Sequence, residues 1–370
     1  MTGIYIHIPF CKSRCIYCGF YSTTGLELRQ RYVDAVCREM EMRSLPPPPS
    51  RKRGSIETIY FGGGTPSQLT GDQLRQLFHY IYKVYGNEAE EVTIECNPDD
   101  VTDAFAAALS HLPVNRVSMG VQTFDDQRLR FLHRRHTATQ VPQAIQRLRD
   151  AGIQNISIDL MYGFPDETLD DWRRDIKAAL ALEVEHISAY CLMIEEGTPL
   201  YQMGVAAADE ETERAMYELL TDKLTAAGYE HYEISNFARP GYRSRHNSSY
   251  WHDVPYIGLG AAAHSYDGNS RSWNVSDIHQ YIEAIEHGKL PSERELLDGN
   301  TRYNDRITVA LRTSDGLDLA SLSEHHRSHC LKEAQRFISD GLLRIDDNHL
   351  VLTRKGLFVS DMVMSGLMLV

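Results

Sequence analysis

The first half of the chain repeats one pattern, in which a short β-branched or apolar segment is followed by a longer segment with helical periodicity. The predicted strands are residues 4–8, 58–61, 92–96, 116–121, 155–160 and 186–191. In the helical segment 73–85, for example, Leu74, Leu77 and Ile81 fall on one face. Strands that alternate with helices favour parallel pairing through right-handed crossovers. Six such units, where a closed α/β barrel has eight, predict a partial (βα)6 barrel that another part of the chain closes.

Composition places the chain among soluble globular proteins. Hydrophobic residues make up 42% and charged residues 24% of the 370 positions, and no run of 18 apolar residues could span a membrane. The net charge of −13 opposes binding to nucleic acid phosphates and to anionic membranes. The seven cysteines are an odd number, and the chain leads straight into a strand without the pattern of a signal peptide. We therefore expect a reducing, cytoplasmic environment.

The strand–helix rhythm fades after about residue 195, which predicts three domains. These are a barrel at 1–195, a barrel-closing extension at 196–295, and a C-terminal α+β domain at 296–370. The last domain combines predicted helices at 301–312 and 322–340, a hairpin of 342–345 with 350–352, and an apolar helix from 354 onward. This order is typical of a winged helix, but the acidic charge favours packing or partner contact over DNA binding.

One basic segment stands out against the acidic chain. Residues 45–54 hold four prolines, two arginines and one lysine. Such a composition predicts a stiff, solvated connector, and a peptide-docking segment is the alternative.

Three of the seven cysteines, Cys11, Cys15 and Cys18, lie within eight residues directly after the first predicted strand. Three thiolates at this spacing can bind three irons of a [4Fe–4S] cluster, and no fourth cysteine follows nearby, so one iron would stay open. A zinc site would need a second ligand pair, and none is placed to complete it. A redox pair of the Cys-x-x-Cys type would leave Cys11 without a role. We therefore favour the cluster, with Phe10 and Tyr17 as its aromatic cover.

Further polar or glycine-rich residues come where the next strands end. The glycine-rich stretch 62–66 follows the second strand, and Glu95, Gln122 and Asp159 end the third, fourth and fifth. Because parallel strands end at one rim of a barrel, we expect these residues to lie beside the cysteines. Each also has a plain alternative, since glycine turns are common and Glu95 or Asp159 could cap the following helix. Their combination on one rim favours a ligand site.

The sequence resembles the radical S-adenosyl-L-methionine (SAM) superfamily in the run from Tyr5 to Cys18 and in the glycine-rich stretch 62–66. Within that superfamily it is similar to the oxygen-independent coproporphyrinogen oxidase-like group, and most closely to the haem chaperones of the HemW family. The similarity continues through residues 158–165, 246–251 and 258–265, and the last domain resembles the C-terminal domain of the same group. The resemblance therefore covers nearly the whole chain.

The resemblance implies that Cys11, Cys15 and Cys18 hold a [4Fe–4S] cluster whose open iron is chelated by the amino and carboxylate groups of SAM. Electron transfer to the sulfonium would give methionine and a 5′-deoxyadenosyl radical, and the cofactor carries that chemistry. The other cofactor-binding residues that it implies are Tyr5, Tyr17, Gly63, Gly64, Thr65, Glu95, Gln122, Arg134 and Asp159. Arg134 suits a carboxylate and Asp159 suits ribose hydroxyls, although Arg134 could instead belong to a basic helix surface.

One position separates two related functions. The oxidase-type pattern resembles Cys-x-x-x-Cys-x-x-Cys-x-Cys, but Phe20 stands where the last cysteine would be, as in HemW-like chains. At the position before Phe20, Gly19 replaces the acidic residue that is often seen in HemW-like chains. The resemblance therefore implies a haem chaperone that passes haem to acceptor proteins. The first alternative is an oxygen-independent coproporphyrinogen III dehydrogenase. The second is a non-catalytic scaffold that the metal stabilises, which binds a partner through its last domain and binds no SAM.

The HNxxYW motif at 246–251 is where the resemblance implies haem binding. His246 is the candidate iron ligand, and Tyr250 and Trp251 could pack on the flat macrocycle. The plain alternative is that His246 is a hydrogen-bonded histidine in a loop against the barrel opening. Further candidate ligands are His252, Tyr256 and His264.

Overall fold

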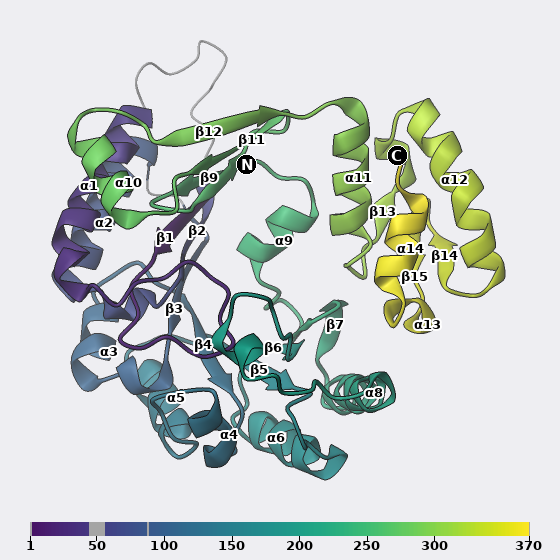
Figure 1. Cartoon of the computed structure of the whole chain (residues 1–370), viewed down its shortest axis with the longest axis horizontal. Coiled ribbons are helices and arrows are strands. Elements are labelled where there is room, and N and C mark those ends of the chain that lie inside the picture. Colours follow the sequence, from purple (N-terminus) through teal and green to yellow (C-terminus); the bar gives the residue numbers. More distant parts are fainter. Residues whose placement is uncertain (1, 44–55, 87–88, 370) are drawn as a thin grey trace.

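The six predicted strands form the centre of one large sheet in the computed structural model, which describes residues 2–43, 56–86 and 89–369. They are β1 (Thr2–Ile8), β2 (Ile56–Gly63), β3 (Glu91–Cys96), β4 (Arg116–Gln122), β5 (Asn155–Tyr162) and β6 (His186–Cys191), each paired in parallel with the next. The helices that cover their outer side are α1 (Arg29–Arg43), α2 (Gly71–Tyr85), α3 (Asp103–Leu109), α4 (Asp126–Phe131), α5 (Gln140–Asp150) and α6 (Leu169–Ala181) (Figure 1). The expected α/β partial barrel is confirmed. The basic segment 45–54 lies outside the described residues.

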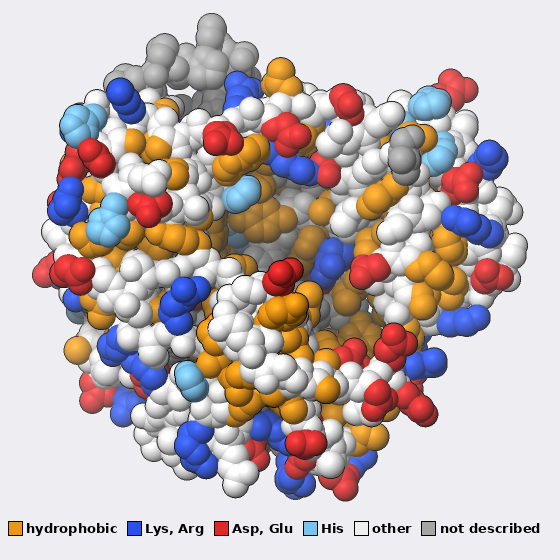
Figure 2. Space-filling view, in the orientation of Figure 1, with side chains coloured by type: hydrophobic (Ala, Val, Ile, Leu, Met, Phe, Trp, Pro, Cys, Tyr) orange, Lys and Arg blue, Asp and Glu red, His pale blue; other side chains and the backbone are white. Residues whose placement is uncertain are grey.

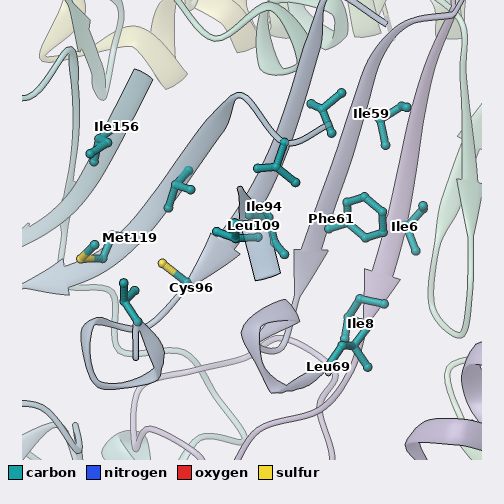
Figure 3. Packing of buried hydrophobic residues seen from close by; sticks show 14 of the residues in the cluster. Ile6, Ile8, Ile59, Phe61, Leu69, Ile94, Cys96, Leu109, Met119 and Ile156 are labelled. Carbon is teal, nitrogen blue, oxygen red and sulfur yellow. The ribbon is translucent and has the colours of Figure 1, made fainter. Parts of the chain in front are cut away.

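Successive side chains of a strand point to opposite faces, which gives this barrel an apolar outside and a polar inside. Ile6, Phe61 and Met119 belong to the hydrophobic cluster that joins the strands to the helices (Figure 3). The inner face is polar, as where the Tyr60 hydroxyl donates to Glu95 Oε1 over 2.7 Å. Strands of buried parallel sheets are usually apolar on both faces, so a polar interior indicates a ligand site.

Short strands from the second half of the chain extend both sides of this core. On the β1 side lie β9 (Tyr256–Leu259), which is parallel to β1, and then β10 (His264–Tyr266), β11 (Ser270–Asn274) and β12 (Ser292–Leu296), which are antiparallel. On the β6 side lie the antiparallel strands β8 (Asn236–Ala238) and β7 (Glu230–Glu233). The sheet ends at β12 and β7 without closing. Sequence periodicity missed these strands because segments of three to five residues are too short to show it.

Helix α9 (Arg245–Trp251) lies at the open side of the barrel (Figure 1), and the space-filling view shows a hollow there with hydrophobic side chains on its walls (Figure 2). Glu91 holds its first turn, because the carboxylate accepts the backbone N–H groups of Arg245 (3.0 Å) and His246 (2.9 Å). Glu91 begins β3, so α9 lies toward the amino ends of the strands. Other helical segments of the middle region and loops are η1 (Leu26–Leu28), η2 (Pro66–Gln68), η3 (Pro98–Asp100), α7 (Pro199–Gln202), α8 (Glu210–Ala226) and α10 (Ile278–Glu286).

The C-terminal part has its own small sheet and its own apolar core. Its elements are α11 (Gly299–Ala310), β13 (Leu317–Asp318), η4 (Leu319–Ser321), α12 (Glu324–Ser339), β14 (Leu343–Asp346), β15 (His349–Leu352), α13 (Arg354–Leu357) and α14 (Ser360–Leu367). The single helix expected from residue 354 onward is thus two helices, separated where Val359 leaves helical geometry (φ −127°, ψ 28°). Arg312 joins this part to the barrel by donating to the buried Glu233 carboxylate of β7 over 2.9 Å. None of the helices within the described ranges is long and apolar enough to cross a membrane.

Candidate metal and cofactor site

The loop after β1 carries Cys11, Cys15 and Cys18 to the carboxyl ends of the barrel strands. All three line one cavity of about 600 Å³. Backbone hydrogen bonds fix the loop at two points, from Cys11 N–H to the Thr23 carbonyl (2.9 Å) and from Ile16 N–H to the Leu132 carbonyl (3.3 Å). The cysteines are therefore held in place by the rest of the barrel.

The three thiols suit a cluster better than a single metal ion. Burial raises the pKa of Cys11 and Cys18, and bound iron would offset this because positive charge favours the thiolate. In the described part of the chain, no three His, Cys, Asp or Glu side chains converge where one metal ion could bind them. A zinc site needs such convergence, whereas each thiolate of a cluster binds its own iron.

Two glycines let the end of β2 lie close to β1 and to the cysteine loop. Gly63 has φ 109°, which favours glycine, and a Cβ there would lie 2.6 Å from the His7 ring. A Cβ on Gly64 would lie 3.1 Å from Cys11 Sγ. Thr65 Oγ1 lies 3.4 Å from the same sulfur, within hydrogen-bonding distance. Backbone rather than side chain therefore forms this wall of the cavity, and Gly63 belongs to β2 itself instead of the loop expected after it.

The two predicted carboxylates, Glu95 and Asp159, line the cavity, as does Glu195, which was not predicted. Glu95 also accepts the Gly63 N–H over 3.1 Å. Burial raises the pKa of Glu95 to about 7 and that of Asp159 to about 6. Carboxylates that lose hydration in this way bind a positively charged ligand favourably, because its charge restores their ionised form.

Neither carboxylate caps a helix, so that alternative is wrong. Thr102 is the N-cap of α3 and Thr168 is the N-cap of α6. Asp159 also does not end its strand, because β5 continues to Tyr162. It reaches the cavity because it points into the barrel from the middle of β5.

Gln122 reaches the cavity through a distortion of β4. The pairing of β4 with β5 shifts between Gly120 and Gln122, and Gln122 has φ 70°. Bulges and left-handed backbone at non-glycine residues are frequent next to functional sites, where they redirect a side chain. Gly120 leaves the necessary space, since a Cβ there would lie 2.9 Å from Gln122 Nε2 and 3.1 Å from Arg134 Nη2.

Arg134 connects the cysteine loop with the neighbouring loops. Its guanidinium lies 3.7 Å from Cys15 Sγ, donates to Asn97 Oδ1 over 2.7 Å, and donates to the Gly120 carbonyl. It therefore does not belong to a basic helix surface. Its Nε is buried and has no partner among the described residues. An unpaired guanidinium N–H of this kind suits an anionic group of a ligand.

Some cavity residues were not predicted from the sequence. They include Asn97, Ser118, Met161, Tyr190 and Met193. Ser118 and Met161 lie two residues from Gly120 and Asp159, so the two-residue period of a strand was a sufficient sign for both. Asn97, whose amide lies 3.5 Å from Thr65 Oγ1, carried no comparable sign in the sequence.

Tyr17 lines the cavity as expected for a residue beside the cluster, but Tyr5 and Phe10 lie outside the set of described residues that line it. The Tyr5 hydroxyl lies deeper in the barrel, 3.1 Å from His7 Nδ1. Phe10 is fully buried in the core, edge-on to Tyr32 at 5.4 Å between ring centroids. The prediction that Phe10 covers the cysteines is therefore wrong, because its side chain turns to the helix-covered side.

His246 of α9 is fully buried. Its Nδ1 lies 2.8 Å from Thr58 Oγ1 and its Nε2 lies 2.7 Å from the Tyr250 hydroxyl. The ring stacks on Tyr60 with 5.0 Å between centroids, and burial lowers the pKa of His246 to about 3. The neutral ring thus has both nitrogens in hydrogen bonds, and one of these bonds would have to break before iron could bind.

The residues present fit the cofactors that the resemblance implies. The three thiols supply the ligands of a cluster, and the glycine backbone of β2 leaves room for a ligand beside Cys11. Glu95 and Asp159 suit the positive charge of a sulfonium compound, and the free Nε of Arg134 suits a carboxylate.

Comparison with known proteins agrees in sequence and in structure. The Radical SAM superfamily matches residues 5–179, and the HemN C-terminal domain matches residues 297–359. The heme chaperone HemW of Lactococcus lactis is 33% identical over 100% of this chain and 97% of its own length. The heme chaperone HemW of Bacillus subtilis is 34% identical over 88% of this chain and 87% of its own. The solved structure of coproporphyrinogen III oxidase (HemN) from Escherichia coli has a TM-score of 0.84 at 21% identity, covering 99% of this chain and 89% of that chain.

Proposed function

The chain belongs to the radical SAM superfamily and, within it, to the HemW family, and we propose that it is a haem chaperone that holds a [4Fe–4S] cluster and SAM. The observation that carries this proposal is the similarity to HemW over the full length of the chain, with a three-cysteine cavity in place. The likeness to HemN supports the fold alone, because only 21% of the residues are identical.

In this proposal each part of the cavity has one task. The bound cluster supplies an open iron and the electron for reductive cleavage of SAM. The thiolates of Cys11, Cys15 and Cys18 would each bind one iron of the cluster. The free Nε of Arg134 binds the carboxylate of SAM, while Glu95 and Asp159 accept from its ammonium and hydroxyl groups.

Phe20 favours the chaperone over the dehydrogenase. Its side chain is 71% exposed at the mouth of the cavity, where the oxidase-type pattern has a fourth cysteine. A phenyl ring supplies no thiol there. Oxidative decarboxylation of coproporphyrinogen III therefore remains the second candidate function.

Haem binding at α9 requires a rearrangement if His246 is the ligand. The ring must give up Thr58 or Tyr250 before a nitrogen can bind iron. His264 is exposed beside Trp273, with 6.1 Å between ring centroids, and needs no such change. In either case, haem would pass to an acceptor protein at the open side of the barrel.

A haem titration tests the proposal. We expect the anaerobically reconstituted protein to bind haemin with a shifted Soret band, and His246→Ala to weaken that binding. His264→Ala tests the exposed alternative, and His279→Ala, an exposed histidine on α10, is the control. Thermal unfolding of each variant separates loss of haem from loss of fold. Unchanged haem affinity in His246→Ala would remove that residue from the role.

An activity assay separates the two candidate functions. The chaperone should transfer haem to an apo-haem protein and leave coproporphyrinogen III unchanged under anaerobic, reducing conditions. Conversion of coproporphyrinogen III by protein with an intact cluster would refute the chaperone assignment in favour of the dehydrogenase.

We further propose a cytoplasmic location. All seven cysteines are free thiols in the structure. A reducing compartment keeps such thiols available for iron. Fractionation of cells that produce the protein, followed by immunodetection, tests this location.

A further inference from the structure

Asp100 lies outside the cofactor cavity, yet its carboxylate joins the loops that build it. Asp100 ends the short helix η3 after β3, and its side chain is only 2% exposed. The carboxylate accepts from Lys12 Nζ (3.0 Å), Ser67 Oγ (3.1 Å), Gln68 Nε2 (2.6 Å) and Arg135 Nη2 (3.0 Å). These donors come from the loops after β1 and β2 and from the segment after α4.

Each of these partners is close in sequence to a residue of the cavity. Lys12 follows Cys11, Ser67 comes two residues after Thr65, Arg135 follows Arg134, and Asp100 itself comes three residues after Asn97. The partners themselves are not among the described residues that line the cavity. Asp100 therefore acts on the cavity only through its neighbours.

The charges around Asp100 are balanced. Asp99 binds the other side of the same guanidinium, with Oδ2 2.7 Å from Arg135 Nη1. Two carboxylates thus meet two cations, Lys12 and Arg135. A buried carboxylate is stable only when it is paired and hydrogen-bonded in this way, and breaking one link disturbs all the groups that share it.

We propose that Asp100 is a positioning residue that holds the cysteine loop in register with the loops that contact SAM. This inference rests on the proposed cofactors and goes beyond their direct contacts. Through Lys12 it fixes Cys11 against Thr65, whose hydroxyl lies 3.4 Å from the sulfur. Through Arg135 it fixes Arg134 against Cys15, 3.7 Å away. The cluster and the SAM contacts then keep one relative position.

The test compares Asp100→Asn with a matched control, Glu39→Gln, in the full-length, anaerobically reconstituted protein. Glu39 is also a fully buried carboxylate with charged and neutral donors, including Arg43 Nε (2.7 Å) and the Tyr281 hydroxyl (2.6 Å), but it ties α1 to α10. We expect both variants to unfold at lower temperature. Only Asp100→Asn should lose iron and weaken SAM binding, by about 10- to 100-fold as for other outer partners of metal ligands.

The readouts are iron per chain, SAM affinity, and the change that SAM causes in the electron paramagnetic resonance spectrum of the reduced cluster. Lys12→Met is a second variant, because Lys12 is half-exposed and its loss should leave the fold intact. It should reproduce the loss of the SAM-induced spectral change. Wild-type values of all three readouts in Lys12→Met, or in a folded Asp100→Asn variant, would overturn the inference.

Different results would refute the proposed chaperone function and the proposed role of Asp100. A wild-type protein that binds cluster and SAM but no haem would refute that function and would leave the role of Asp100 standing. A wild-type protein that takes up neither cluster nor SAM would refute both.

Discussion

The surroundings of a cysteine, more than its residue type, decide its role in this chain. Cys37 and Cys330 are buried in apolar cores, and Cys96 lies among the hydrophobic side chains between sheet and helices (Figure 3). Cys11, Cys15 and Cys18 differ because their loop leaves the sheet and opens into the cavity. Cys96, at the end of β3, and Cys191, at the end of β6, also line the cavity, but they lie on strands of the sheet rather than in this loop.

We predict that Cys11→Ala, Cys15→Ala and Cys18→Ala each abolish cluster assembly, because each removes one of three iron ligands. Cys37, Cys96, Cys191 and Cys330 should tolerate serine without loss of iron. Iron and sulfide per chain after anaerobic reconstitution check this. Loss of iron in Cys96→Ser or Cys191→Ser, with the fold retained, would identify a fourth ligand and contradict an open iron.

The raised pKa of Glu95 predicts how the free energy of unfolding depends on pH. Its pKa is about 7 in the folded chain and 4.5 ordinarily, since burial penalises the charged form. Its contribution to the free energy of unfolding is therefore fully present below pH 4.5 and is lost as pH rises through about 7. Urea unfolding without SAM, at about pH 5 and about pH 8, should show that Glu95→Gln removes part of this fall. Identical pH profiles for the two proteins would contradict the prediction.

At the level of single elements, α9 is a helix of seven residues that depends on its surroundings. A helix this short is not stable alone, so side chains from outside must bind its free N–H groups. Glu91 does this from the start of β3, and Ser244 caps the Asn247 N–H over 3.4 Å. The position of the HNxxYW motif is thus set by a residue that lies about 150 positions earlier in the chain.

Glu91→Gln should loosen α9. Glu91 is 4% exposed and accepts two backbone N–H groups as a charged acceptor. Loss of that charge should lower the free energy of unfolding by roughly 2 kcal/mol. Urea unfolding measures the change, and haem titration shows whether a looser α9 alters haem binding. A free energy of unfolding equal to that of the wild type would show that α9 does not depend on Glu91.

Across the whole molecule, the C-terminal part is attached to the barrel near the open side. Two backbone hydrogen bonds join the parts at β7. Ile234 N–H, just after the strand, donates to the Arg312 carbonyl over 3.0 Å, and Ser314 N–H donates to the Tyr232 carbonyl over 2.9 Å. Helices α9 and α11 also touch. The C-terminal part therefore packs against the same region that carries the HNxxYW motif.

Arg312→Ala should weaken this attachment. It leaves the Glu233 carboxylate, 1% exposed, without its cation, which should cost roughly 2 kcal/mol. Calorimetry should show the C-terminal part unfolding before the barrel. Arg354→Ala is the control, because its pair with Asp222 is exposed on both sides and should contribute little. One unchanged transition in Arg312→Ala would mean that the remaining contacts join the two parts without the Arg312–Glu233 pair.

Local patterns in the sequence were enough to predict the parallel barrel and that the cysteines share a cavity with residues at the strand ends. The strand–helix period is a property of neighbouring residues, and the spacing of Cys11, Cys15 and Cys18 lies within one loop. The place of Glu95 at the end of the third predicted strand likewise predicted that it lies beside the cysteines. These features do not depend on distant parts of the chain.

The remaining features depend on residues that are far apart in the sequence. The strands on both sides of the core are too short to have a period, and they form only because β1 and β6 offer unpaired backbone groups. His246 is a buried hydrogen-bonded residue because Thr58 and Glu91 meet α9 inside the barrel. Asp100 likewise joins the loops after β1 and β2 because folding brings Lys12 and Ser67 to its carboxylate. Only the folded chain brings such groups together, since their free energy comes from burial and pairing across the structure.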